Sequence, residues 1–429
     1  MSRLSGEGRM RSASLLSGSL IYLVASVTTA ALPFLLLPVL TSYMPPAEFG
    51  LLGVFQGLYT LFLALCGLST AGAVVRQSYD VGREEIGVYI FNVLLILAAT
   101  TTTLGLGLLL AGAPLGDWLQ IPPGFMLAGL AAAAMVFTLN LLLGQYQVRR
   151  KPLAYGAFQI GHSALNIGLS LLFVVGLGWG AWGRVSGVMW AALAFGLLAL
   201  VVLRLGGRLR ARWSPQDIRG ALRFGVPLMP HEMGTFFVTW FGVFVLNRMV
   251  SSEAVGLYLF AFQISMVLGV ICDAFNKAYV PWLFELLKTG GAEGQRRIVK
   301  LTYGYFALMA VLTLIAFALA RPVVALVFDP AYLPAAGLIG WLVLGQALGG
   351  CYLMTTNYLA YARRTELLSL VTVAGSVTNV ALLLALIPIL GIHGGVIAFV
   401  VARLVIFLLT WVLAQRVMPM PWRLKSKEV

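Results

Sequence analysis

Twelve long apolar stretches recur along the sequence, each covering about 20 residues, the length that an α-helix needs to cross the hydrocarbon of a bilayer. Of the 429 residues, 60% are hydrophobic and 10% are charged, and no soluble fold buries that much apolar surface. We therefore expect an all-α integral membrane protein of about 12 transmembrane helices, not a cytosolic enzyme, a secreted disulfide scaffold or a disordered chain. The predicted spans run near 17–40, 50–75, 87–111, 124–147, 154–176, 182–203, 221–247, 255–278, 299–320, 335–360, 367–388 and 393–415.

The basic residues alternate between the two sides of the predicted helices. With a cytoplasmic N-terminus, 25 of the 29 Lys and Arg residues fall in inside segments, Arg184, Arg248 and Arg321 fall in outside segments, and Arg403 lies within a span. The positive-inside rule then predicts a multi-pass protein with both termini cytoplasmic. The net charge of +14 follows from this asymmetry, and anionic lipid headgroups add to it, so we expect no nucleic-acid partner.

Short segments of the first half recur in the second half. Residues 46–51 resemble residues 252–257 at an offset of 206, and at an offset of 213 the residues Arg150, Asn166 and Gly178 return as Arg363, Asn379 and Gly391. Both offsets are close to half the length, which predicts two pseudo-symmetric six-helix lobes in the same orientation. The N-terminal lobe is expected at 1–203, a basic cytoplasmic linker at 204–220 and the C-terminal lobe at 221–429. Parallel repeats of this kind are a transporter architecture.

Prolines interrupt the first and seventh predicted spans, which are equivalent in the two halves. Pro33 and Pro38 lie in the first span, and Pro227 and Pro230 lie in the seventh. A proline kinks a helix and frees carbonyls, which a membrane tolerates only where protein or a wet cavity satisfies them. We interpret the four prolines as gate or hinge positions; the alternative is a static kink that aids packing.

A set of short motifs over most of the chain carries a family resemblance. In the first half they are Gly18-Ser19-Leu20-Ile21-Tyr22, Glu48-Phe49-Gly50, Gly67-Leu68-Ser69-Thr70-Ala71 and Val75-Arg76. In the second half they are Phe224-Gly225-Val226-Pro227, Val255-Gly256-Leu257-Tyr258, Ala274-Phe275-Asn276-Lys277-Ala278-Tyr279-Val280-Pro281, Tyr332-Leu333-Pro334-Ala335-Ala336, Arg363-Arg364-Thr365, Asn379, and Ile387-Pro388 with Gly391, Gly394 and Gly395. With these motifs the sequence resembles the oligosaccharide flippases (Wzx-type polysaccharide exporters) of the MOP superfamily.

The resemblance implies a V-shaped, MATE-like bundle of two lobes with a cationic cavity. It implies a flippase that moves an undecaprenyl-pyrophosphate-linked oligosaccharide from the inner to the outer leaflet of the bacterial cytoplasmic membrane by alternating access. O-antigen, capsule or exopolysaccharide assembly would use the product, so a glycan polymerase and glycosyltransferases of the same pathway are expected partners. The chain departs from many relatives at Gly242, where they carry an Asp. Its first span also lacks the charge found in related lipid II flippases.

Cations near or inside the spans are the candidate contacts for a pyrophosphate, because a charge within the bilayer is costly. Arg403 lies about ten residues into the last span, where its guanidinium can bind two phosphate oxygens or form a structural pair with Asp273 or Glu232. Lys277 is expected to pair with Asp273 four residues earlier and to line the inner mouth of the cavity. Arg76 and Arg248, at the ends of their spans, either anchor the helices at the interface or receive the headgroup.

Uncharged polar residues within the spans are the candidate sugar contacts. His162, Asn166 and Asn379 either bind sugar hydroxyls or bond one helix to another, and for the asparagines we favour the bond between helices. Glu232 and then Asp273 are the candidates for coupling to H⁺ or Na⁺, with His231 beside Glu232. A satisfied polar pair at the proline kink is the alternative role for His231 and Glu232.

Two other functions compete with the flippase. A drug or metabolite antiporter of the same superfamily needs an acidic cavity, but only two carboxylates lie well inside the spans. A membrane glycan-polymerising enzyme needs a sizeable loop with an acid, a base or a metal site. The outside loops are short and contain no such motif, and the three cysteines and three histidines are dispersed. We therefore expect no metal and no cofactor apart from a coupling ion.

Overall fold

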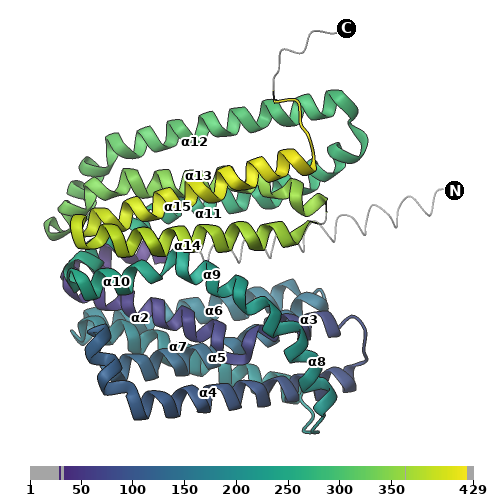
Figure 1. Cartoon of the computed structure of the whole chain (residues 1–429). Helices are drawn as coiled ribbons and strands as arrows, with labels where there is room; N and C mark the ends of the chain where they lie inside the picture. Colours follow the sequence, from purple (N-terminus) through teal and green to yellow (C-terminus); the bar gives the residue numbers. More distant parts are fainter. Residues whose placement is uncertain (1–28, 30–32, 363, 423–429) are drawn as a thin grey trace. The chain divides into compact units, whose positions relative to one another are not determined.

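The structure, a computed structural model, describes residue 29, residues 33–362 and residues 364–422. Within these residues all the regular secondary structure is helical. They form two compact units (Figure 1). The first unit comprises the described residues up to Met44 and Val54–Met233, and the second comprises Pro45–Gly53 and the described residues from Gly234 onward. The division between the units therefore falls inside two helices, α2 (Pro46–Leu65) and α9 (Met229–Thr239).

Ten helices of the described residues are long and apolar enough to cross a membrane, which confirms an all-α, multi-pass membrane fold. In the first half they are α2, which continues through a 3-10 turn (Cys66–Ser69) into α3 (Ala71–Gln77), then α4 (Arg83–Leu119), α5 (Pro123–Val148), α6 (Pro152–Leu171) with a π-turn (Leu172–Gly176), and α7 (Gly180–Leu205). In the second half they are α11 (Ser252–Thr289), α12 (Gly291–Val327), α13 (Ala336–Tyr361) after a 3-10 turn (Pro330–Ala335), α14 (Thr365–Leu390) and α15 (Ile392–Val417).

The two remaining predicted spans differ from the other ten. Most of the first span lies outside the described residues, and its described end is a short apolar helix, Pro33–Tyr43. The seventh span is broken into α8 (Pro215–Gly225), a 3-10 turn (Val226–Leu228), α9 and α10 (Phe241–Met249). The count of twelve therefore stays a prediction.

Small residues bring the helices of each unit into close contact, as expected where lipid gives no hydrophobic drive between helices. In the first unit, a Cβ on Gly196 of α7 would lie 2.8 Å from the Met135 carbonyl oxygen of α5. In the second unit, α12, α13, α15 and α14 lie side by side in that order (Figure 1). Their contacts include Gly345 of α13 against Phe399 of α15 and Gly375 of α14 against Ile406 of α15.

The turns after two repeated helices each contain a glycine with a positive φ. Gly178 follows the π-turn after α6, and Gly391 follows α14, and both have a positive φ, of 68° and 54°. A left-handed φ is costly for residues with a Cβ, so glycine is the residue that suits both turns. These two glycines were predicted to be equivalent from their offset of 213 residues. Arg363, the predicted counterpart of Arg150, lies outside the described residues.

The segment that joins α7 to α8 is docked on α4 within the first unit. The buried Asn92 of α4 donates to the Arg212 carbonyl at 2.9 Å and accepts from the Ser214 N–H at 2.9 Å. Arg210 forms an ion pair with Glu84, and the Ser214 hydroxyl caps α8 by accepting from the Asp217 N–H. Arg208 is buried here, and burial together with the neighbouring Arg149 and Arg83 lowers its pKa. The basic segment is therefore held by specific contacts.

Candidate functional site

Arg403 is a cation on α15 in the interior of the second unit. Its guanidinium carbon lies 5.2 Å from the centre of the Phe399 ring, one helical turn earlier, which is a cation–π contact. Its Nε is buried without a hydrogen-bond partner. On α13, a Cβ added to Gly349 would lie 3.9 Å from an Arg403 terminal nitrogen, so this glycine leaves space beside the guanidinium.

No carboxylate neutralises Arg403 among the described residues. Asp273, which the sequence offered as one alternative partner of Arg403, pairs with Lys277 at 2.7 Å, as the spacing of four residues indicates. The other ion pairs of the described residues are Arg210 with Glu84 and Arg364 with Glu366. A guanidinium held by an aromatic ring and without a counter-ion is suited to bind an anion, and phosphate oxygens match its geometry.

Asn379 bonds two helices of the second unit. It is 2% exposed on α14, and its amide donates to the carbonyls of Phe237 at 3.0 Å and Val238 at 3.3 Å. These carbonyls precede the break at Trp240 between α9 and α10, where the backbone no longer supplies their usual donors. Ser376, one turn earlier on α14, donates to the Gly234 carbonyl at 2.9 Å. Asn379 thus makes a bond between α14 and α9, the kind of contact favoured for it from the sequence.

His162 and Asn166 lie on α6 in the first unit, and Asn166 contacts an arginine that the sequence had placed in an outside segment. Arg184 lies on α7 and donates from one terminal nitrogen to Asn166 Oδ1 and, at 2.6 Å, to Ser170 Oγ. The Nε2 of His162 is buried without a partner. Sequence reasoning missed Arg184 because it lies close to a span end. The signal that could have found it is the polar pair Asn166 and Ser170, one turn apart on the facing helix.

The other predicted site residues lie near helix ends or at exposed positions. Arg76 and Arg248 are exposed in the last turns of α3 and α10. Lys277 and Asp273 are exposed on α11, and Glu232 is exposed in the first turn of α9. Nothing is described of the His231 side chain. The structure thus brings Lys277 together with Asp273; the α6 residues belong to the first unit, and Arg403 and Asn379 belong to the second.

The four predicted hinge prolines coincide only partly with breaks. Pro227 lies in the 3-10 turn that separates α8 from α9, and Pro230 lies in the first turn of α9. Pro33 begins the short described helix, and the Pro38 carbonyl within it accepts from the hydroxyls of Thr41 and Ser42. The second break of the seventh span, at Trp240, contains no proline.

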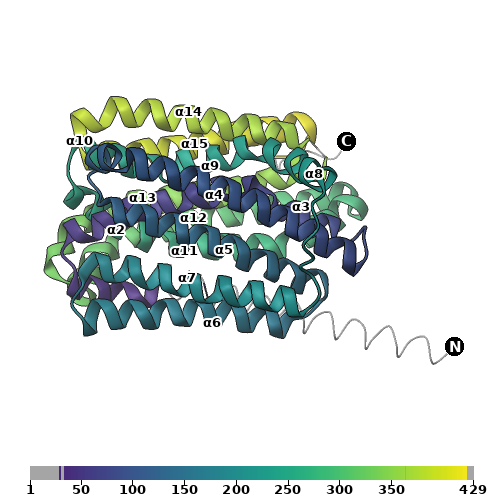
Figure 2. The ribbon, with the colours of Figure 1, turned by 90° about the horizontal axis from the view of Figure 1, so that it is seen from below.

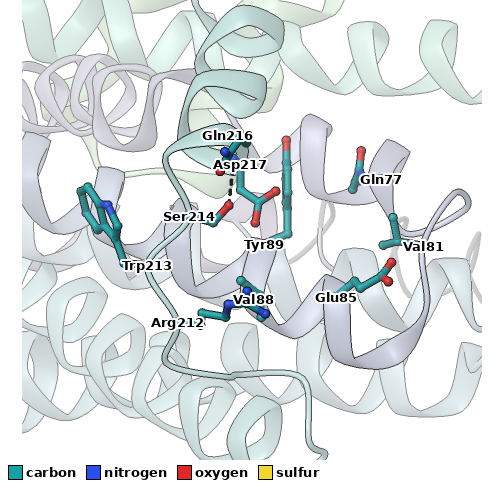
Figure 3. A pocket seen from close by; sticks show the side chains of 10 residues that line it. All are labelled: Gln77, Val81, Glu85, Val88, Tyr89, Arg212, Trp213, Ser214, Gln216 and Asp217. Atoms are coloured by element: carbon teal, nitrogen blue, oxygen red, sulfur yellow. Dashed lines mark hydrogen bonds between the residues drawn. The ribbon is translucent and has the colours of Figure 1, made fainter.

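A polar pocket of about 320 Å³ lies in the first unit where the α7–α8 segment meets α3 and α4 (Figure 3). In Figure 3, Asp217 lies beside the Tyr89 side chain, and Gln77 and Glu85 line the α3–α4 side. None of the residues predicted for substrate or ion binding lines this pocket.

Known proteins resemble the chain in sequence and in structure. Residues 15–287 match the family described as polysaccharide biosynthesis protein. An uncharacterised membrane protein of Haemophilus influenzae is 29% identical over 288 residues, 65% of this chain and 68% of that protein. A protein of the Lsg locus of the same organism is 24% identical over 395 residues, 88% of this chain and 94% of that protein.

Solved transporters share the fold. An inward-facing multidrug resistance MATE family transporter of the MOP superfamily has a TM-score of 0.72 and 17% identity, covering 93% of this chain and 96% of its own. The lipid II flippase MurJ in its inward closed conformation has a TM-score of 0.77 and 9% identity, covering 92% of this chain and 87% of its own. The chain therefore has the fold of these solved transporters, and the ten apolar helices of its described residues make it a multi-pass membrane protein.

The family match extends over more than half of the chain, so the protein belongs to the family of polysaccharide biosynthesis proteins. The resemblance to Wzx-type exporters that the motifs indicated is thereby confirmed.

Proposed function

We propose that this protein flips a polyprenyl-pyrophosphate-linked oligosaccharide from the inner to the outer leaflet of the bacterial cytoplasmic membrane. The observation that carries the proposal is Arg403, a guanidinium inside a spanning helix that rests on Phe399 and has no carboxylate partner among the described residues. A cation in a membrane helix is expensive and is retained where it serves a substrate or an ion path. Membership in a family of polysaccharide biosynthesis proteins supports a glycan-bearing substrate.

The proposed mechanism follows from the solvation of the substrate. The polyprenyl tail remains in the hydrocarbon, whereas the pyrophosphate and the sugars need a polar route. Arg403 supplies charge-assisted hydrogen bonds to the phosphate oxygens along that route, and the cation–π contact with Phe399 holds it without neutralising it. Alternating access then exposes the head first to the cytoplasmic side and then to the outer side.

The proposal also covers the orientation of the protein in the membrane, its pathway and its coupling ion. Both termini are cytoplasmic in it, and the product passes to the glycan polymerase of the pathway that assembles O-antigen, capsule or exopolysaccharide, after glycosyltransferases have built the repeat unit. Coupling to H⁺ or Na⁺ through Glu232 or Asp273 is part of the proposal. The ion pair of Asp273 with Lys277 makes Glu232, which has no ion pair among the described residues, the better first target for substitution.

The test replaces Arg403 in the host that makes the polysaccharide. Arg403→Ala is expected to abolish export of the polymer while the abundance of the protein in the membrane stays normal. Arg403→Lys keeps the charge but loses the two-pronged contact, so we expect intermediate export. Arg416→Ala is the matched control, because Arg416 is exposed in the last turn of the same helix. Normal export by an abundant Arg403→Ala protein would overturn the phosphate role and with it the proposal.

A further inference from the structure

Helix α6 has one polar face. Its polar residues are Tyr155, Gln159, His162, Ser163, Asn166 and Ser170. At about 100° per residue, these side chains project within an arc of about 100°, and the larger apolar side chains of the helix lie outside that arc. We call these six residues the α6 polar face. In a helix that crosses a membrane, such a face needs a polar environment.

The α6 polar face is turned away from the surface of the first unit. The exposed residues of α6 are all apolar and lie on the opposite side: Leu153, Ala157, Ile160, Ala164 and Gly168. Residues of the polar face are partly buried or, at Ser170, fully buried. Helix α6 lies alongside α7 (Figure 2), and the added Cβ of Gly187 would meet Ser170 Oγ at 2.5 Å. The exposed apolar side suits lipid, so the polar side faces the protein interior.

A cation contacts one end of the α6 polar face. Arg184 of α7 donates from one terminal nitrogen to both Asn166 and Ser170, and none of the ion pairs of the described residues includes it. The Ser170 hydroxyl in turn donates to the Asn166 carbonyl at 2.6 Å. A guanidinium has five N–H donors. Because only one nitrogen of Arg184 donates to these two acceptors, N–H groups on its other nitrogens remain for further hydrogen bonds.

Two polar atoms of the face lack partners. Gln159 Oε1 and His162 Nε2 are buried without a hydrogen bond, one turn apart on α6. A buried acceptor without a donor costs about 1–3 kcal/mol, so a face that serves only to bond helices is expected to satisfy such atoms. Asn379 of α14 also has one unpartnered buried atom, its Oδ1, but its amide nitrogen donates to two backbone carbonyls. The unpartnered atoms of α6 therefore indicate a ligand that brings hydroxyl donors.

We propose that the α6 polar face, with Arg184, is a binding site for the hydroxyl-rich glycan head of the transported lipid. Sugar hydroxyls both donate and accept, and they match a row of amide, imidazole and hydroxyl groups closed by a guanidinium at one end. The row from Gln159 to Ser170 extends about 16 Å along the helix, which is longer than one sugar ring. This inference rests on the proposed flippase function. It adds a sugar-binding site whose residues differ from the phosphate contact at Arg403.

The test measures binding to the purified full chain in lipid nanodiscs. Two probes are compared: the lipid-linked oligosaccharide extracted from the host membrane, and undecaprenyl pyrophosphate without sugar. The variants are Gln159→Leu and His162→Phe, which remove the unpartnered atoms. Ala164→Leu on the exposed apolar side of α6 is the matched control. Thermal stability is recorded for each variant, because removing an unpartnered buried polar atom leaves stability unchanged or raised.

Each variant of the α6 polar face is expected to bind the oligosaccharide probe about tenfold more weakly, as for the loss of one buried hydrogen bond, and the sugar-free probe as wild type does. Equal affinity of the stable variants and wild type for the oligosaccharide probe would overturn the sugar site and leave the flippase proposal standing. Equal losses for both probes would also overturn the sugar site. Wild-type protein that binds neither probe would overturn the flippase proposal itself.

Discussion

Gly50 and Gly256 pack each against the helix that carries the other, at the starts of α2 and α11. A Cβ on Gly50 would lie 1.8 Å from the Ser252 carbonyl oxygen, and a Cβ on Gly256 would lie 1.8 Å from the Pro46 carbonyl oxygen. Pro46 and Ser252 are 206 residues apart, as are Gly50 and Gly256. The contact is therefore reciprocal, as two equivalent segments produce when a local twofold relates them. It supports the internal repeat that the sequence indicated.

Gly50→Ala is expected to destabilise the protein, because the new methyl group would overlap a backbone carbonyl that cannot move independently of its helix. Overpacking of this kind costs about 1–3 kcal/mol. Gly107→Ala is the control, since no atom lies within 4 Å of an added Cβ there and alanine favours a helix by about 1 kcal/mol. Thermal unfolding in detergent should show opposite shifts for the two variants. Similar midpoints would contradict the tight contact at Gly50.

Asn379→Leu should lower the stability of the second unit, because it removes the amide that donates to the carbonyls of Phe237 and Val238 at the break before α10. The expected loss is about 1–3 kcal/mol in the free energy of unfolding. Thr378→Ala is the neighbouring control, because the Thr378 hydroxyl bonds only within its own helix, to the Ala374 carbonyl. Unfolding in detergent measures both. An Asn379→Leu protein as stable as Thr378→Ala would show that the bond between α14 and α9 is not needed.

Asn92→Leu should release the α7–α8 segment from α4, because the side chain holds both the Arg212 carbonyl and the Ser214 N–H. We expect trypsin to cut at the arginines of this segment about tenfold faster, as for the loss of roughly 1.4 kcal/mol of local stability. Thr103→Ala on the same helix should cut at the wild-type rate, since that exposed hydroxyl bonds only to Ala99. Unchanged cleavage in Asn92→Leu would mean that other contacts hold the segment.

Phe399→Leu tests the support of Arg403. Removing the ring takes away the cation–π contact, about 1 kcal/mol, so the affinity for undecaprenyl pyrophosphate in nanodiscs is expected to fall about fivefold. Phe407→Leu is the control, because Phe407 is also buried on α15 and its ring contacts the rings of Phe306 and Trp411. Equal affinities in the two variants would count against a role for the Phe399 ring in holding the guanidinium.

Much of the fold and part of the candidate site followed from local sequence. The pair of Asp273 with Lys277 was predictable, because residues four apart on a helix share a face. The break at Trp240 was not, since no proline or glycine occupies that position and the carbonyls freed there are satisfied by Asn379, 142 residues from Phe237. Arg184 was likewise not predicted as a site residue. Its partners lie on a different helix, and counting charges alone assigned it to an outside segment.

The sequence by itself determined that the chain lies in a lipid bilayer, that it is helical and which family it resembles. These properties depend on composition, on runs of apolar residues and on short motifs. It also placed Arg403 inside a span. Only the tertiary structure decided that Asp273 is not the partner of Arg403, and that Arg184 completes the polar face of α6. The physical reason is that a pairing between two helices depends on their register and rotation, which packing of the whole unit sets and no local pattern encodes.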